Sequence, residues 1–280
     1  MKKIAIIANG SKDITYMHTK HLAEYLLGKA EVYMEKDMAM LGIDVNYTEY
    51  NELFKMAEIM IVLGGDGTIL QVATACAKNS IPVIGINLGR VGFITEIEVD
   101  NMKKAVDAIL NDEYSIENRM LLKVKIMRGD KQIESHALND VVVSKGGRAK
   151  LIHTNMFSDD EMVADYIADG LIIATPTGST GYSISAGGPV VDPSMQLFVA
   201  TPICPHMLSA RSAVLGADKE ITVRLDSDYR GNEAVVCCDG DIVAPINSGD
   251  TVKITKSKYE FKMIKIGGYS FYDTLIRKLS

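Results

Sequence analysis

The sequence has few cysteines and no long apolar run, and each absence argues against a class of protein. Its 280 residues contain 4 cysteines, none of them in a CxxC pair. This pattern favours reduced, buried thiols over a disulfide framework. No apolar stretch is long enough to span a bilayer, and the apolar run near the start ends at Ala8, too early for a secretory signal. We therefore expect a cytoplasmic protein with no membrane partner.

The sequence also lacks an excess of positive charge and several catalytic signatures. It has 30 Lys and Arg against 36 Asp and Glu, a formal net charge of -6. This balance argues against a nucleic-acid partner, which needs a positive footprint. A small anionic ligand would then depend on backbone amides and on individual cations such as Lys150 or Arg148. The sequence contains no HxxxH, HxH or Cys/His cluster and no GxSxG, so neither a zinc site nor a serine hydrolase is indicated.

The first part of the chain alternates predicted strands and helices. Apolar runs predict buried strands, whereas apolar residues at helical spacing predict the helices between them. The predicted strands are 4–8, 32–34, 59–63 and 82–87, and the predicted helices are 15–29, 69–78 and 102–110. Strands separated by helices indicate parallel crossover units. We therefore predict an open α/β nucleotide-binding domain over residues 1–115.

The pattern changes after residue 115 to a succession of short strands. The predicted strands are 121–126, 137–143, 150–157, 171–174, 221–225, 234–238, 251–254 and 261–266. Such a succession indicates a mostly antiparallel, β-rich domain resembling a β-sandwich, here over 116–269. A C-terminal helix over 270–280 is able to pack back on the first domain.

Three glycines surround an aspartate at the end of a predicted buried strand, in the run Gly64-Gly65-Asp66-Gly67-Thr68. Ligands collect at the carboxyl ends of such strands, and the helix that follows offers unpaired N–H groups to a phosphate. Asp66 is then a carboxylate beside an anion site, suited to accept a proton from a hydroxyl or to hold Mg²⁺ through water. The alternative is a tight strand-to-helix turn in which Asp66 is a helix cap. The run is neither GxGxxG nor the Walker pattern.

Three other runs offer polar groups near predicted strand ends. The glycine-rich run 87–93, which contains Arg90, is expected beside the first loop, although an ordinary strand-ending loop also explains it. The run 175–183 is rich in hydroxyls and ends near Tyr182, a face for a base to stack on; the alternative is a turn with a core tyrosine. Asn139 and Asp140 lie in an apolar run and need partners, because an unpaired buried polar group costs about 1–3 kcal/mol. A ribose, an adenine edge or a bulge would supply them.

Taken together, these runs resemble the NAD kinase family over almost the whole chain. The matching segments are 64–68, 87–96, 139–140, 169–170, 175–189, 202–211 and 239–240. The glycine run 64–68 is shared with diacylglycerol, sphingosine and phosphofructo-kinases and marks a superfamily. The run 175–180, followed by Tyr182 and Gly187-Gly188, is more specific. The resemblance implies transfer of the γ-phosphoryl group of ATP to the adenosine ribose 2′-hydroxyl of NAD, with Mg²⁺ carried by ATP, in a homotetramer or dimer.

The resemblance also implies roles for residues that match the family's motifs. Asp66 resembles the proton acceptor, and it orients the 2′-hydroxyl while the phosphates are neutralised. The implied NAD-binding residues are Asp66, Gly67, Asn139, Asp140, Lys150, Asp169, Thr180, Gly181, Tyr182, Ser183, Ile184 and Ser185, and the phosphate loop comprises Gly64, Gly65 and Thr68. No side chain is expected to ligate a metal directly.

The chain differs from the family's pattern at four positions. Asp140 stands where Glu is usual, Gly181 where Ala is usual, Gln71 where many relatives have a basic residue, and Asp241 where Gln is frequent. The glycine run alone also fits a lipid or sphingoid-base kinase, and the binding motifs also fit an NAD(P) sensor that transfers no phosphate. The preference between NAD and NADH, and between ATP and polyphosphate, stays open.

Overall fold

The chain folds into two compact units, each described by itself. The computed structural model describes residues 1–89, 92–95, 97–147, 150–207, 209–226, 233–267 and 270–279. Unit 1 comprises Met1–Asn118 with Tyr259–Ser280, and unit 2 comprises Arg119–Lys258. Two long strands, β7 (Ser115–Arg128) and β18 (Thr251–Lys265), each give one end to either unit. The domain limits inferred from the sequence stay a prediction; the units differ from them chiefly in placing Tyr259–Lys265 with the first part of the chain.

Unit 1 is built on a parallel sheet with the strand order β3-β2-β1-β4-β5, continued by β18. The strands are β1 (Lys3–Ala8), β2 (Glu31–Glu35), β3 (Asn46–Thr48), β4 (Ile59–Gly64) and β5 (Val83–Asn87), with the short β6 (Ile97–Glu98) beside β5. Every residue of β4 and β5 is buried, since both strands lie inside a sheet covered on two faces.

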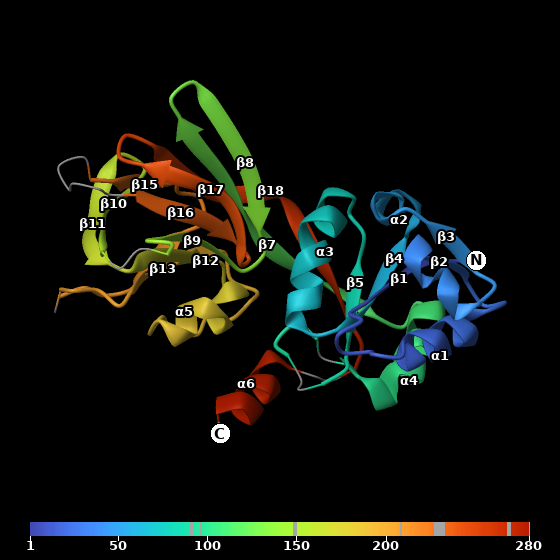
Figure 1. The fold of residues 1–280 in the computed structure, drawn as a ribbon. Coiled ribbons are helices and arrows are strands. Elements are labelled where there is room, and N and C mark those ends of the chain that lie inside the picture. Colours follow the sequence, from blue (N-terminus) through green and yellow to red (C-terminus); the bar gives the residue numbers. More distant parts are fainter. Residues whose placement is uncertain are drawn as a thin grey trace. The chain divides into compact units, whose positions relative to one another are not determined.

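Helices cover both faces of this sheet (Figure 1). One face packs against α1 (Met17–Leu26) and α4 (Met102–Leu110), whose apolar side chains join those of alternate strand positions in a single core cluster. The helices α2 (Tyr50–Met56) and α3 (Asp66–Lys78) contact strands β1, β2, β4 and β5. The connections also include the 3₁₀ helices η1 (Lys36–Leu41) and η2 (Val99–Asn101), and α6 (Phe271–Leu279) closes the chain within unit 1. The predicted open α/β fold is confirmed.

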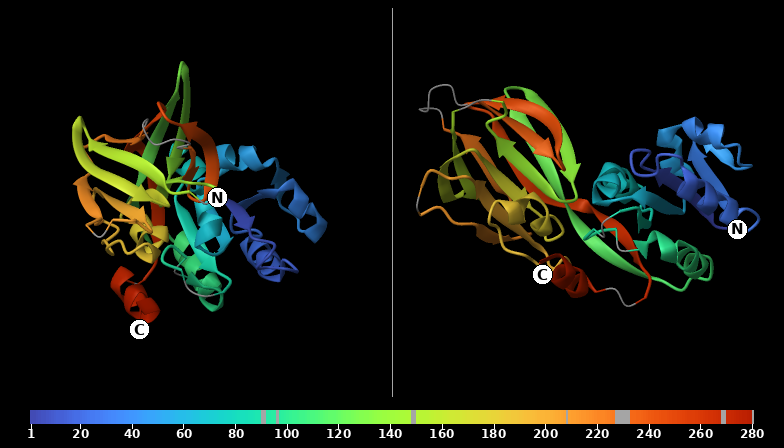
Figure 2. Two further views of the ribbon diagram at one scale, coloured as in Figure 1. Left: turned by 60° about the vertical axis from the view of Figure 1, so that its left-hand side comes forward. Right: turned by 60° about the horizontal axis from the view of Figure 1, so that its bottom comes forward.

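Unit 2 is a β-sandwich, with its two sheets visible in the right-hand view of Figure 2. One sheet has the order β14-β13-β12-β9-β16-β17, and its strands are β9 (Asp140–Ser144), β12 (Gly170–Ala174), β13 (Leu197–Ile203), β14 (Ala213–Gly216), β16 (Glu233–Cys238) and β17 (Asp241–Asn247). The other contains β18 and β7 with β8 (Lys131–Ala137), β10 (Ile152–Ser158), β11 (Glu161–Ala168) and β15 (Ile221–Leu225). The short helices η3 (Gly178–Thr180) and α5 (Tyr182–Ser185) follow β12.

Side chains from both sheets fill one core in unit 2. Val141 and Ile173 from the first sheet belong to the same buried cluster as Met156, Val223 and Ile254 from the second. Burying an aliphatic side chain of this size contributes about 1.5–3 kcal/mol, so the cluster accounts for the pairing of the sheets. The predicted β-rich, sandwich-like fold is confirmed.

The structure divides three of the predicted strands differently. The prediction of one strand over 137–143 is wrong, because β8 ends at Ala137 and β9 begins at Asp140. Conversely, the predicted strands 251–254 and 261–266 are one strand in the structure, β18, which ends at Lys265. The polar stretch between them alternates in burial, with Ser257 buried, so the strand continues through it.

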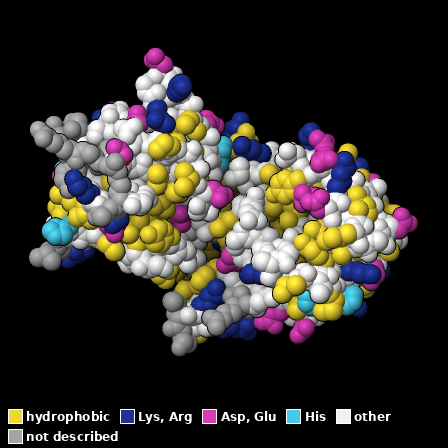
Figure 3. Space-filling model, in the orientation of Figure 1, with side chains coloured by type: hydrophobic (Ala, Val, Ile, Leu, Met, Phe, Trp, Pro, Cys, Tyr) yellow, Lys and Arg dark blue, Asp and Glu magenta, His cyan; other side chains and the backbone are white. Residues whose placement is uncertain are grey.

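Three further features concern helix length, the cysteines and the surface charge. No helix in the described parts of the chain is long and apolar enough to cross a membrane. All four cysteines are free thiols, of which Cys76 and Cys238 are buried and Cys204 is exposed. Acidic and basic side chains are interspersed on the face in Figure 3, rather than gathered into one basic patch.

Candidate active site

The run Gly64–Thr68 connects the end of β4 to the start of α3. Gly65 precedes the helix, and the buried Thr68 accepts a hydrogen bond from Gly65 N at 3.4 Å and one from Asn9 Nδ2 at 3.1 Å. A Cβ on Gly64 would lie 2.3 Å from Thr68 Oγ1, so only glycine fits there. The hydroxyl of Thr68 therefore holds the loop together, while the exposed Gly67 presents the helix start to solvent.

The carboxylate of Asp66 is held by the loop that follows β5. Its Oδ2 accepts a hydrogen bond from Phe93 N at 2.8 Å. Its Oδ1 accepts three, from Ile94 N at 3.2 Å and from the N and Oγ1 of Thr95 at 2.9 Å each. A Cβ on Gly92 would lie 1.8 Å from this same Oδ1. Asp66 is thus a half-buried carboxylate with a fixed orientation at the start of a helix.

The position of this loop in the sheet is the one that binds ligands in open α/β folds. The chain builds outward from β1 through β2 to β3, and then crosses to β4 on the other side of β1. The strand order therefore reverses between β1 and β4, and ligands bind outside the carboxyl ends of strands at such a point. The run Gly64–Thr68 follows one of these two strands directly.

The other predicted residues lie in unit 2, where Asn139 belongs to the short connection between β8 and β9 and Asp140 is the first residue of β9. The carboxylate of Asp239 accepts the backbone N–H groups of Leu138, Asn139 and Asp140 at 2.7, 2.7 and 3.2 Å. Asp239 lies in the turn that joins β16 to β17. Asp239 thus holds the backbone of residues 138–140 although it lies about a hundred positions away in the sequence. No spacing rule could have shown this contact.

The Asn139 side chain faces the segment after β12. A Cβ on Gly181 would lie 3.4 Å from Asn139 Nδ2 and 3.9 Å from Asp140 Oδ2, and one on Gly178 would lie 2.0 Å from the Asn139 backbone oxygen. Asn139 Oδ1 is buried and accepts no hydrogen bond from any part of the chain that the structure describes. A buried acceptor without a donor is costly, so this atom is suited to a ligand hydroxyl or amino group.

The buried carboxyl group of Asp140 lies near the half-buried carboxyl group of Asp239. Asp140 is 6% exposed, and burial, together with the nearby Asp239, raises the pKa of Asp140 to about 7. Burial also raises the pKa of Asp239, against the lowering effect of its three backbone donors. Asp140 therefore changes charge near neutral pH, which is unusual for an aspartate.

The predicted residues in the segment 180–185 differ in their exposure to solvent. Tyr182 and Ser185 are exposed, Thr180 and Ile184 are half-buried, and Thr180 Oγ1 donates to Thr177 O at 3.1 Å. Ser183 is fully buried, with its hydroxyl 3.0 Å from that of Thr201, so its side chain supports the fold of α5.

The two charged residues predicted to contact NAD in unit 2 are Lys150 and Asp169. Lys150 is exposed and precedes β10. Asp169 lies between β11 and β12, and its Oδ1 is 2.6 Å from the ammonium group of Lys145. Arg90 and Arg148, also named from the sequence, lie outside the described residues.

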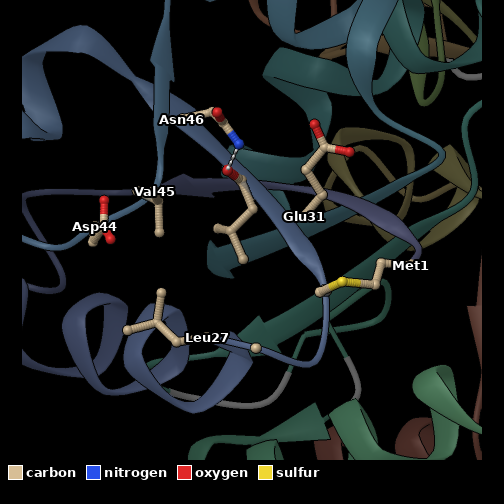
Figure 4. A pocket seen from close by; sticks show the side chains of 9 residues that line it. Met1, Leu27, Glu31, Asp44, Val45 and Asn46 are labelled. Carbon is tan, nitrogen blue, oxygen red and sulfur yellow. Dashed lines mark hydrogen bonds between the residues drawn. The ribbon is translucent and has the colours of Figure 1, made fainter.

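A pocket of about 530 Å³ opens elsewhere in unit 1, and its lining includes Met1, Leu27, Glu31 and Asn46 (Figure 4). Asn46 Nδ2 donates to Val32 O at 3.2 Å across its wall. None of the predicted site residues lines this pocket.

The structure therefore groups the predicted residues into two clusters. The first is the run 64–68 with loop 92–95 in unit 1, and the second is the turn 139–140 with the segment 178–185 in unit 2. The protein thus combines an open α/β unit and a β-sandwich unit, and each unit has one cluster of candidate site residues.

Comparison with known proteins identifies the family. Residues 4–114 match the model of the ATP-NAD kinase N-terminal domain, and residues 138–266 match that of the C-terminal domain. An NAD kinase of Lachnoclostridium phytofermentans is 39% identical over 284 residues, covering 99% of both chains. The crystal structure of an NAD kinase from Archaeoglobus fulgidus in complex with ATP matches with a TM-score of 0.75 and 27% identity, covering 99% of this chain and 98% of the other.

The fold is also that of a yeast NADH kinase complexed with NADH, with a TM-score of 0.89 at 24% identity, covering 100% of this chain and 87% of the other. The chain belongs to the NAD kinase family.

Proposed function

We propose that this protein phosphorylates NAD with ATP. The 2′-oxygen of the adenosine ribose attacks the γ-phosphorus, the bond from that phosphorus to the β–γ bridging oxygen breaks, and NADP, ADP and one proton result. The observation that carries this proposal is Asp66, a carboxylate fixed at a phosphate-binding helix start in a member of the NAD kinase family. The A. fulgidus relative crystallised with ATP supports ATP as the donor.

Asp66 orients the 2′-hydroxyl and accepts its proton as the oxygen–phosphorus bond forms. Four hydrogen bonds hold its carboxylate in one direction, so the acceptor hydroxyl meets a positioned oxygen. Positioning and charge neutralisation supply most of the rate enhancement in phosphoryl transfer, and the exposed amide of Gly67 at the start of α3 is available to the phosphates.

NAD is recognised by the cluster in unit 2. The unpartnered Oδ1 of Asn139 accepts from a ribose hydroxyl or the adenine amino group, and Asp140 accepts a second hydroxyl. The exposed ring of Tyr182 offers a face for the adenine. Gly67, Lys150, Asp169, Thr180, Gly181 and Ile184–Ser185 complete the proposed contacts.

The divalent metal, the assembly and the location are part of the same proposal. Mg²⁺ prefers oxygen ligands and keeps several waters, which suits a metal that comes with ATP, with Asp66 as the carboxylate able to hold one of those waters. It would neutralise the charge of the phosphates. A homotetramer or dimer is proposed from the family resemblance. A cytoplasmic location is supported by the four free cysteines.

The experiment incubates the purified full chain with ATP, Mg²⁺ and NAD and detects NADP by mass spectrometry. Parallel reactions contain diacylglycerol or a sphingoid base in place of NAD, NADH in place of NAD, or polyphosphate in place of ATP. Formation of NADP supports the proposal. Phosphorylation of a lipid alone identifies a lipid kinase, and NADP binding without any transfer identifies a sensor. Either of these results overturns the proposal.

A further inference from the structure

Lys12 places a positive charge over the glycine loop, in a way that no sequence motif indicated. A Cβ built on Gly65 would come within 2.2 Å of Lys12 Nζ. The ammonium group therefore occupies the space that a side chain at position 65 would take. Because Gly65 directly precedes α3, the cation lies next to the backbone from which the helix starts.

The backbone of Lys12 is fixed relative to this loop. Its N–H donates to Asn9 O at 2.9 Å, and Asn9 is bound to the end of β4 through Leu63 O at 2.9 Å and Thr68 Oγ1 at 3.1 Å. The next residue, Asp13, is 3% exposed, and its carboxylate accepts hydrogen bonds from Thr19 at 2.7 and 2.9 Å. Hydrogen bonds of Asn9 and Asp13 thus anchor the loop after β1 on both sides of Lys12, so the lysine side chain extends from a fixed backbone position.

The sheet topology places this loop at the ligand-binding edge. Lys12 follows β1, whereas Gly65 follows β4, and these neighbouring strands are the pair at which the strand order reverses. The loops on either side of such a reversal form the crevice that receives a ligand in open α/β sheets. Lys12 and Gly65 therefore belong to the two walls of one site.

The charge of Lys12 has no partner among the described residues. Its side chain is exposed, and its Nζ makes no hydrogen bond or ion pair with any residue that the structure describes. A helix start carries a partial positive charge, so an ammonium beside it is unfavourable until an anion binds to both. Lysine is well suited to phosphate as a compact charge with three donors.

We propose that Lys12 binds the terminal phosphoryl group of the donor nucleotide and neutralises its charge during transfer. This inference rests on the proposed function, because it assigns a donor-binding residue to that reaction. Lys12 Nζ donates to the phosphoryl oxygens from one wall of the crevice, while the amides of the glycine run donate from the other. NAD does not contact Lys12 in this arrangement.

The kinetic test compares Lys12→Met and Lys12→Arg with Lys78→Met. Lys78 is an exposed lysine at the far end of α3, so its variant removes the same charge away from the loop. For Lys12→Met we expect kcat/KM for ATP to fall about ten- to hundredfold, as for loss of one charge-assisted hydrogen bond, with KM for NAD within about twofold of wild type. Lys12→Arg should recover part of the loss, and Lys78→Met should match wild type. An unchanged KM and kcat for ATP, or a rise in KM for NAD alone, overturns the proposal.

A second test uses the wild-type chain and so does not depend on the folding of a variant. Trace acetylation of lysines is followed by mass spectrometry with ATP, with NAD, and with neither. ATP should protect Lys12 severalfold and NAD should not, while Lys78 reacts equally throughout. Equal labelling of Lys12 with and without ATP overturns the inference. If the wild-type chain transfers no phosphate to NAD, the proposed function is overturned. The labelling experiment still tests whether Lys12 binds ATP, because it requires no phosphoryl transfer.

Gly65→Ala provides an independent check on the same geometry. Its methyl group would take the place of Lys12 Nζ, so the variant should also weaken ATP binding measured by calorimetry. In the double variant with Lys12→Met, the loss of ATP affinity should be smaller than the sum of the two single losses, because both changes remove the same contact. Fully additive losses would show that the two residues act independently and would count against the assignment.

Discussion

Thr95 donates two hydrogen bonds to one oxygen of Asp66: its backbone N–H and its hydroxyl each lie 2.9 Å from Oδ1. The two residues are 29 positions apart and lie in the segments that follow two neighbouring strands, β4 and β5. The orientation of the proposed proton acceptor is therefore set by the loop after β5 as well as by its own helix.

Removal of the Thr95 hydroxyl should impair catalysis more than binding. Thr95 is fully buried, and its hydroxyl also accepts from Asn87 Nδ2 at 3.1 Å. In Thr95→Val, the lost hydrogen bonds should lower the free energy of unfolding by about 1–3 kcal/mol. We expect kcat to fall about tenfold because Asp66 loses part of its orientation, with KM for NAD nearly unchanged. Steady-state kinetics and urea denaturation check both effects. Thr95→Ser should restore kcat, and a Ser variant as slow as Val would refute the role of the hydroxyl.

Gly92 should tolerate no side chain, because Asp66 occupies the space. A methyl group there would lie 1.8 Å from Oδ1 of Asp66 and 2.5 Å from Oγ1 of Thr95. Gly92→Ala must therefore displace the carboxylate or the loop, and we expect kcat to fall at least a hundredfold while the far-ultraviolet circular dichroism is kept. Gly89→Ala is the control in the same connection, since its methyl group meets nothing closer than 3.9 Å. Similar losses in both variants would mean that the loop itself, rather than its contact with Asp66, is sensitive.

The sequence predicted the fold class and the elements with strong periodicity. Helix 102–110 and strand 221–225 have the predicted limits, because apolar spacing determines such segments locally. The strand over 137–143 was wrong for a tertiary reason: the Asp239 carboxylate takes the N–H groups of residues 138 and 139, which a continuous strand would pair elsewhere. β11 was missed because its first residues are exposed on both faces and show no alternation.

In the candidate site, too, local features could be predicted from the sequence, whereas contacts between distant segments could not. The glycine run was visible because three glycines at a strand end are a local signal, but the four donors to Asp66 come from residues 93–95, and Lys12 comes from the loop after β1. Nothing in the spacing of a lysine between Ser11 and Asp13 marks it. Only the strand order brings the two loops to one edge. Contacts between distant loops depend on topology, which periodicity does not specify.

Gly178 and Gly181 should differ sharply in their tolerance of alanine. A methyl group on Gly178 would lie 2.0 Å from the backbone oxygen of Asn139, an atom that cannot move independently of the turn. On Gly181, the nearest atoms are Gly178 O at 3.3 Å and Asn139 Nδ2 at 3.4 Å, so a shift of a few tenths of an ångström suffices. We expect Gly178→Ala to lower the thermal midpoint by several degrees and to weaken NAD binding more than tenfold. Gly181→Ala should stay within about threefold of wild type by calorimetry. The reverse order would contradict the placement of the Asn139 turn.

Asp140 should make the free energy of unfolding fall as the pH rises towards neutrality, which is the reverse of the usual effect of an aspartate. Its pKa is about 7 in the folded protein but near 3.9 in an unfolded chain. Between these values the folded state binds more protons, so this group's contribution to stability falls as the pH rises and the full penalty is present above pH 7. Asp140→Asn removes the charge and should therefore be more stable than wild type at pH 8, by up to a few kcal/mol, with the advantage shrinking towards pH 4. Urea denaturation of both proteins across this range measures the difference.

Asp159 supplies the control of opposite sign. Its carboxylate accepts from Glu220 N at 3.1 Å and Lys219 Nζ at 3.0 Å, and these hydrogen bonds lower the pKa of Asp159. Asp159→Asn should therefore lose stability relative to wild type, and the loss should be present at neutral pH and fade as the pH falls below the unfolded pKa. A difference between Asp140→Asn and wild type that is constant from pH 5 to pH 8 would show that Asp140 is not a buried carboxyl group titrating near neutrality.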